Sequence, residues 1–229
     1  MATPHLELPD DFEYESYKAV SSRIGPLHES HQLQWREYST AWEAVAIRFL
    51  TCAEHDEAFT RSVTTHGDAP QQPERYFQER DLFGFFVTGL PTIESACYGL
   101  YAIASMLDDV NFPIKEAKDK RAIKPESTAM QFRKAFPNEA ISRALKGMVD
   151  SQEYKDWNKV RNILAHRGWH ARTIYASTVG SGDDTHGDAL WLNGIPLNAS
   201  TTPSRRAWLA GTLQTLLREA HSFARTKEF

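Results

Sequence analysis

Cysteine is scarce in this sequence of 229 residues, which has only Cys52 and Cys97 and no Cys-x-x-Cys pair. Two cysteines cannot form the disulfide framework of a small secreted protein, and the usual zinc-binding cysteine spacing is missing. The opening MATPHLELPDDFEYE is acidic and lacks the apolar stretch of a secretory signal. We therefore expect a cytoplasmic location.

Long apolar runs are also lacking. Between Asp81 and Asp108 the only charged residue is Glu94, but the uncharged runs on either side, 82–93 and 95–107, are shorter than the ~18 residues that a membrane-spanning helix needs. This stretch predicts a buried helix and no membrane association. No phosphate-binding loop, dinucleotide fingerprint or nucleophile elbow is present either.

The charge is distributed unevenly along the chain. The net charge is only −4, which by itself argues against a nucleic-acid partner. Residues 1–114, however, carry 7 Lys/Arg against 18 Asp/Glu, and residues 115–229 carry 19 against 12. A basic surface is therefore available in the second half, where the run Lys115–Lys124 would either follow an RNA backbone or form ordinary helix surface.

Length and periodicity predict one domain of mainly α class, a helical bundle with a β-hairpin inserted before the last helix. Residues 1–26 contain three prolines and are expected to form an acidic arm with little regular structure, followed by a single domain at 27–229. Pro91 should kink or split the second long helix. The expected helices span 28–62, 74–107, short pieces within 110–136, 138–149, 151–167 and 203–225, and the hairpin spans about 172–197 with strands at 172–179 and 189–197.

The segment from Asp156 to His170, DWNKVRNILAHRGWH, contains the most informative pattern. At about 100° per residue, its apolar residues fall within an arc of about 120°, the side expected to be buried. Arg161, Asn162 and His166 fall on the opposite side, where Asn158 and Ala165 also lie. One helix face thus carries a permanent cation, an amide and a titratable imidazole.

The run Arg161-Asn162-x3-His166 resembles the Arg-x4–6-His signature of the HEPN superfamily, in which a polar residue often follows the arginine. The resemblance implies a helical bundle with the motif near the end of a late helix. It also implies a metal-independent endoribonuclease of a toxin–antitoxin or phage-defence system, working as a homodimer on RNA, with an antitoxin protein as a further partner. No metal and no cofactor is expected.

The resemblance also gives the site residues their roles. Arg161 would stabilise the phosphate, His166 would act as acid or base, and Asn162 would orient either group, while Arg167, Lys159 and Asn158 would contact RNA. This chemistry is physically reasonable, because attack of the ribose 2′-OH on the phosphate needs proton transfer and stabilisation of the developing negative charge. A single histidine cannot easily act as acid and base at once, whereas a dimer supplies two.

Glu94 is the second candidate, with Tyr98 as a supporting residue. These two begin a stripe of polar side chains at helical spacing within an otherwise apolar segment. A charge in such a segment must be paired or hydrogen-bonded. We expect Glu94 to reach Arg161 or His166, with a surface lysine or a tyrosine hydroxyl as the alternative partner.

Other interpretations remain open. His166 could merely favour the negative end of its helix, and Arg161 could pair with a surface carboxylate such as Asp156. His166 and His170 have the spacing of zinc ligands but lack a third ligand in the pattern.

The domain could instead be a non-catalytic HEPN-like module that binds nucleotide, RNA or a protein partner. It could also be an interaction protein whose acidic half docks on a basic partner, with an exposed apolar patch on the helix at 28–62 and no open cleft at Arg161.

Overall fold

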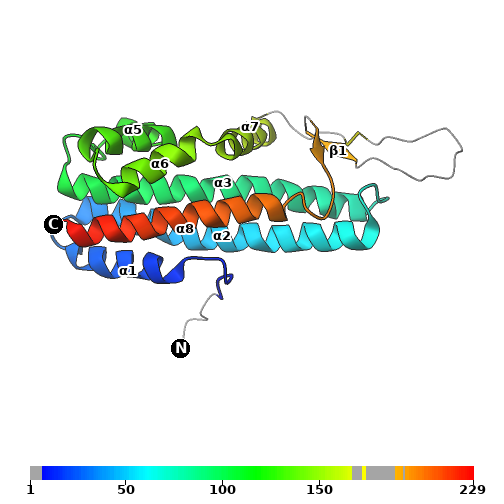
Figure 1. The fold of residues 1–229 in the computed structure, drawn as a ribbon, viewed down its shortest axis with the longest axis horizontal. Coiled ribbons are helices and arrows are strands. Elements are labelled where there is room, and N and C mark those ends of the chain that lie inside the picture. The colour runs from blue at the N-terminus through cyan, green and yellow to red at the C-terminus, as the bar shows by residue number, and fades with distance from the viewer. Residues whose placement is uncertain (1–6, 167–171, 174–188, 193) are drawn as a thin grey trace, which may run out of the picture.

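The computed structural model describes residues 7–166, 172–173, 189–192 and 194–229. The protein is mainly helical, with a small antiparallel hairpin before the last helix, which confirms the predicted fold class (Figure 1). In chain order the elements are α1 (Tyr14–Ile24), a 3₁₀ turn (Gly25–His28), α2 (Gln32–His66), α3 (Glu74–Leu107), α4 (Ala117–Ala122), α5 (Pro125–Ala135), α6 (Ala140–Asp150), α7 (Gln152–His166), β1 (Leu190–Trp191), β2 (Ile195–Pro196) and α8 (Pro203–Thr226).

The helices α2 and α3 form a long antiparallel pair that runs the length of the bundle. Each has about 35 residues, which corresponds to roughly 50 Å of helix. Large side chains of α2, among them Tyr38, Trp42 and Phe49, recur at helical spacing and are buried against α3. In Figure 1, α5, α6 and α7 lie along one side of α3 and α1 lies at the opposite side of the bundle, while α8 runs between α3 and α1 in this view and contacts α6 as well. Helix α3 is therefore the central element.

Pro91 does not split α3, which continues from Glu74 to Leu107. Of the two effects expected of Pro91, a kink or a split, the split is not observed, and the expected helical span of 74–107 is confirmed. Proline removes only one backbone hydrogen bond, and the helix around it is held by packing against α2, α7 and α8. The Pro91 carbonyl accepts a hydrogen bond from Arg48 of α2 at 3.0 Å.

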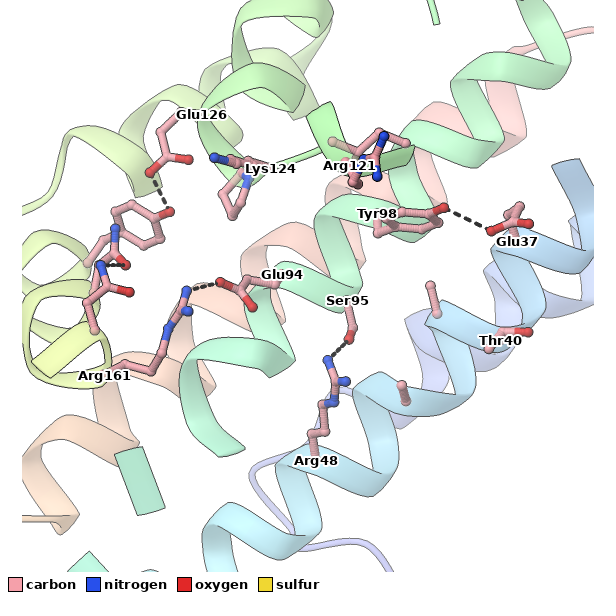
Figure 2. Close-up of a pocket in the computed structure, with 17 residues that line it drawn as sticks. Glu37, Thr40, Arg48, Glu94, Ser95, Tyr98, Arg121, Lys124, Glu126 and Arg161 are labelled. Carbon is pink, nitrogen blue, oxygen red and sulfur yellow. Dashed lines mark hydrogen bonds and ion pairs between the residues drawn. The ribbon is translucent and has the colours of Figure 1, made fainter. Parts of the chain in front are cut away.

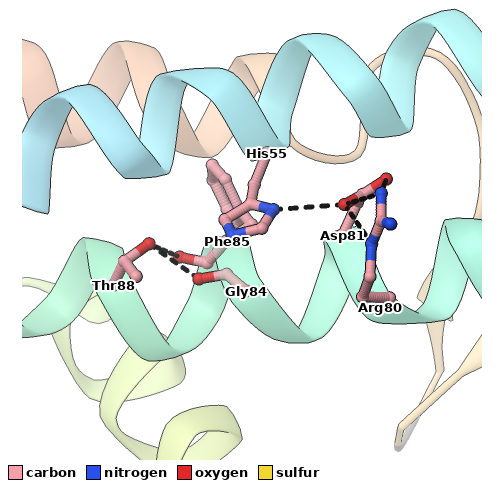
Figure 3. A network of polar contacts seen from close by, with 6 residues as sticks. All are labelled: His55, Arg80, Asp81, Gly84, Phe85 and Thr88. Carbon is pink, nitrogen blue, oxygen red and sulfur yellow. Dashed lines mark hydrogen bonds and ion pairs between the residues drawn. The ribbon is translucent and has the colours of Figure 1, made fainter.

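A polar cluster joins the C-terminal half of α2 to the N-terminal half of α3 (Figure 3). The buried carboxylate of Asp81 accepts two hydrogen bonds of 3.0 Å from the neighbouring Arg80 guanidinium and lies 3.2 Å from His55 Nδ1. Gly84 makes room for the imidazole, because a Cβ at this position would lie 2.3 Å from His55 Nε2. The cluster satisfies a buried charge at the helix interface.

The expected irregular arm at 1–26 was wrong for its second half, which is helical, and residues 1–6 lie outside the described residues. Residues 14–24 form α1, in which Val20 and Ile24 are fully buried, and α1 packs on α8. Two of the acidic residues of this segment pair with arginines of α8. Glu13 binds Arg218 at 2.8 Å, and Asp11 binds Arg206 at 2.7 Å.

Both strands of the observed hairpin lie within 189–197, which the sequence predicted as a single strand. Leu190 pairs with Pro196 and Trp191 with Ile195, and the intervening turn contains Gly194 at φ +92°. The expected first strand, 172–179, is represented by a bridge between Thr173 and Leu190, and the rest of it lies outside the described residues. None of the described helices is both long and apolar enough to cross a membrane.

Candidate functional site

A groove of about 820 Å³ lies over the middle of α3 (Figure 2). Its floor is formed by α3, its walls by α2 and α7, and its remaining side by the connection from α4 to α5. The lining residues are Glu37, Thr40, Ala41, Ala44 and Arg48 of α2; Glu94, Ser95 and Tyr98 of α3; Arg121, Ile123, Lys124, Pro125 and Glu126; and Tyr154, Asn158, Arg161 and Asn162 of α7.

The groove stays open because the α2 wall carries small side chains at its centre. Thr40, Ala41 and Ala44 separate the charged residues Glu37 and Arg48 at its two ends. Glu37 and Arg48 are eleven residues apart along the helix, which corresponds to about 16 Å. This is long enough for an extended ligand.

Helix α7 is fixed in place by its buried side. Ser151 Oγ accepts a hydrogen bond from the Tyr154 amide at 3.2 Å and so caps the helix start. Trp157 is only 3% exposed, stacks on Phe85 at 5.1 Å, and donates from Nε1 to the Phe86 carbonyl at 3.2 Å. It packs over Gly89 of α3, where an added Cβ would lie 2.3 Å from the indole. This close packing turns the opposite face of α7 toward the groove.

Arg161 and Glu94 form an ion pair across the groove, from α7 to α3 (Figure 2). Their side chains are 26% and 35% exposed, so both reach the groove without being fully solvated. Arg161 Nη2 donates to Glu94 Oε1, and Arg161 Nε is buried without a partner among the described residues. This is the contact expected for Glu94.

The two asparagines of α7 also line the groove. Asn162 Nδ2 donates to Asn158 Oδ1 at 3.1 Å, which fixes the two amides relative to each other. Tyr98 lies on the floor, but its hydroxyl donates to Glu37 at 2.9 Å rather than to the motif. Tyr98, expected as a supporting residue, therefore supports the α2 wall of the groove through Glu37.

The remaining predicted residues lie elsewhere or outside the described part. Lys159 is on the other side of α7, where it lines a separate pocket with Trp157 and Trp208. His166 is the last residue of α7, one helical turn after Asn162, and its side chain is outside the described residues. Arg167 and His170 are also outside them.

The sequence analysis missed several groove residues. Arg48 donates from Nη1 to Ser95 Oγ at 2.6 Å, and no motif marks it in the sequence. Arg121 and Lys124 belong to the basic run at 115–124, which signalled a basic surface without placing it. Glu37 and Glu126 complete the charged lining.

The groove carboxylates are each engaged by a donor. Burial alone would raise the pKa of Glu37, but hydrogen bonds from Lys120 at 2.5 Å and from Tyr98 outweigh it and hold that pKa below its usual value. Glu126 accepts a hydrogen bond from Tyr154 at 2.8 Å. Burial, and then this bond, raise the pKa of the Tyr154 hydroxyl, which stays protonated.

An open groove at Arg161 disagrees with the interaction-protein interpretation, which required that no cleft be present there. On the helix at 28–62, Ile47 is the one large apolar side chain that is clearly exposed among the described residues.

No group of three or more His, Cys, Asp or Glu side chains in the described ranges is arranged to hold a metal ion. Comparison with protein-family models, with curated proteins and with solved structures found no match.

Proposed function

We propose that this protein is a metal-independent endoribonuclease of HEPN type. The observation that carries the proposal is the Arg161–Glu94 ion pair on the wall of a groove long enough for an RNA strand. The arginine of the Arg-x4-His motif thereby lies at the edge of a cavity, partly exposed, and is paired with a carboxylate from another helix. The assignment to a toxin–antitoxin or phage-defence system rests on the resemblance alone.

In the proposed reaction, the ribose 2′-OH attacks the adjacent phosphate, and the 5′-oxygen of the next nucleotide leaves. Arg161 stabilises the negative charge on the phosphate, since a guanidinium offers several donors in a fixed plane. Its Nη2 donates to Glu94 Oε1, and this contact restrains the guanidinium at the groove. Asn158 and Asn162 provide amide donors on the same wall.

His166 supplies the proton transfers in this proposal, because an imidazole can act as both acid and base near neutral pH. The reaction removes a proton from the 2′-OH and delivers one to the leaving oxygen. One imidazole cannot do both at once, so we propose a homodimer in which two copies of the motif share a cleft.

The test is cleavage of an end-labelled RNA in the presence of EDTA. The parent should cut under these conditions, and Arg161→Ala or His166→Ala should lower the rate by about 100-fold or more, the usual effect of losing a charge stabiliser or an acid–base group. Arg218→Ala removes an arginine from an ion pair far from the groove, and His221→Ala removes a histidine of α8, so both serve as matched controls. Full activity in both motif variants would refute the site, and loss of parental activity on chelation would refute a metal-independent reaction.

The size of the groove favours one second candidate, a non-catalytic domain that binds a nucleotide. A volume of about 820 Å³ lies within the range of small-molecule sites. In that case the parent would bind nucleotide without cutting RNA, and Arg161→Ala would lower the affinity.

A further inference from the structure

We infer that Arg121 and Lys124 form a second phosphate-binding subsite, across the groove from Arg161. The evidence begins with the pairing of the basic residues at 115–124. Three lysines of this segment bind carboxylates: Lys115 binds Asp109 at 2.6 Å, Lys118 binds Glu116 at 3.0 Å, and Lys120 binds Glu37 at 2.5 Å. Within the described part of the chain, Arg121 and Lys124 bind no carboxylate, and these two line the groove.

The start of α5 adds to the positive potential at this place. Lys124 is the N-cap of this 11-residue helix, and Pro125 is its first residue. The positive end of the helix dipole therefore lies beside the two cations. Ser127 Oγ accepts a hydrogen bond from the Lys124 amide at 2.8 Å, which holds the connection against the groove.

The carboxylates that line the groove do not neutralise the positive charge of Arg121 and Lys124, because most of them are paired with other cations. Glu94 is paired with Arg161, and Glu37 is paired with Lys120. When these pairs are set aside, the charges lining the groove are Arg48, Arg121 and Lys124 against Glu126 alone. A cavity with an excess of cations favours an anionic ligand.

The arrangement in space favours an anion with more than one phosphate. In Figure 2, Arg121 and Lys124 lie along one edge of the groove, and Arg161 of α7 and Arg48 of α2 lie apart from them on the two walls. We assign the anion to the phosphates of one RNA strand, and this identity rests on the proposed function. Arg161 then takes the phosphate that is cut, and Arg121 and Lys124 hold a neighbouring part of the same strand.

The experiment compares two double variants of the full chain. Arg121→Gln with Lys124→Gln removes both groove cations. Arg133→Gln with Lys134→Gln removes the same charge from exposed positions at the other end of α5. Because all four residues are on the surface, both variants should unfold at temperatures close to that of the parent.

The probe is a single-stranded oligonucleotide with 2′-O-methyl riboses, which binds but cannot be cut, titrated at several salt concentrations. Each phosphate contact on a single strand contributes about 0.7 to the slope of log K against log salt, so the groove variant should lower the slope by about 1.4. The surface variant should keep the parental slope, as should Arg121→Lys with Lys124→Arg, which retains both charges. Equal slopes in the groove and surface variants would overturn the subsite.

A second titration with ATP distinguishes the source of the phosphate. If only ATP affinity falls in the groove variant, the subsite stands but its ligand is a free nucleotide, and the assignment to an RNA strand is wrong. Parental RNA cleavage is measured alongside. If the parent cuts RNA but the groove variant and the surface variant give equal salt slopes, the subsite alone is refuted. If the parent neither binds nor cuts RNA, the proposed function is refuted as well.

Discussion

Replacing Gly89 by alanine tests the contact that positions α7. Gly89 is buried in the middle of α3, directly beneath Trp157. An added Cβ would lie 2.3 Å from the indole Cζ2 and 3.0 Å from Cys52 Sγ, so α7 must move or the indole must turn. The indole has little freedom, because it is stacked on Phe85 and hydrogen-bonded to the backbone.

The expected loss of stability can be worked out from two opposing effects. Overpacking of a close-packed core costs about 1–3 kcal/mol, and a contact this short with a fixed ring belongs at the upper end. Alanine regains about 1 kcal/mol of helix propensity relative to glycine. The free energy of unfolding should therefore fall by about 2 kcal/mol, which lowers the Tm by about 4–8 °C for a chain of this size.

Gly147 and Gly211 provide matched controls. Both lie within helices, and a Cβ at either position would meet nothing within 4 Å. Gly147→Ala and Gly211→Ala should each raise the Tm by about 2–4 °C, from the helix-propensity gain alone. Thermal unfolding followed by circular dichroism measures all three. A Gly89→Ala variant that is stabilised like the controls would refute the packing of α7 on α3, and with it the placement of Arg161.

Two further predictions concern stability and thiol chemistry. Burial raises the pKa of Glu37, but hydrogen bonds from Lys120 and Tyr98 outweigh this effect and lower the pKa in the folded protein. The resulting stabilisation is complete above the unfolded pKa of 4.5 and is lost as the pH falls through the lower folded pKa. Glu37→Gln should therefore lower the Tm at pH 7 and much less at pH 3, and an equal decrease at both pH values would contradict the pairing. Cys52 and Cys97 are buried, and burial raises the pKa of both thiols. A thiol reagent should therefore label neither cysteine in the native protein and both after unfolding. Fast labelling of the native protein would contradict their burial.

Local patterns were enough to predict most of the helices. Periodic apolar residues located α2, α3 and α7, and the last helix was expected to begin at residue 203, where α8 starts. Glu94 could be singled out because it is an isolated charge in an apolar helix, which requires a partner. These features depend on residues close together in the sequence.

The errors of prediction concern features that form through contacts between residues far apart in the sequence. The acidic N-terminal residues resemble an irregular arm until α8 supplies arginines such as Arg218 to pair with them. Arg48, Arg121 and Lys124 come from separate elements, and their common groove exists only once α2 and the start of α5 are placed around α3. Nothing in the local sequence distinguishes Arg48 from other surface cations, and the basic run at 115–124 does not reveal which of its members line the groove.

The central claim is that Arg161, positioned by Glu94, is the centre of RNA cleavage. A double-mutant cycle of Glu94→Gln and Arg161→Ala, measured as single-turnover cleavage in EDTA with the Tm of each variant, tests it most directly. Because Glu94 acts through Arg161, each single variant should lower the rate, and the double variant should be no slower than Arg161→Ala alone. Effects that multiply, or an Arg161→Ala variant as fast as the parent, would contradict the claim.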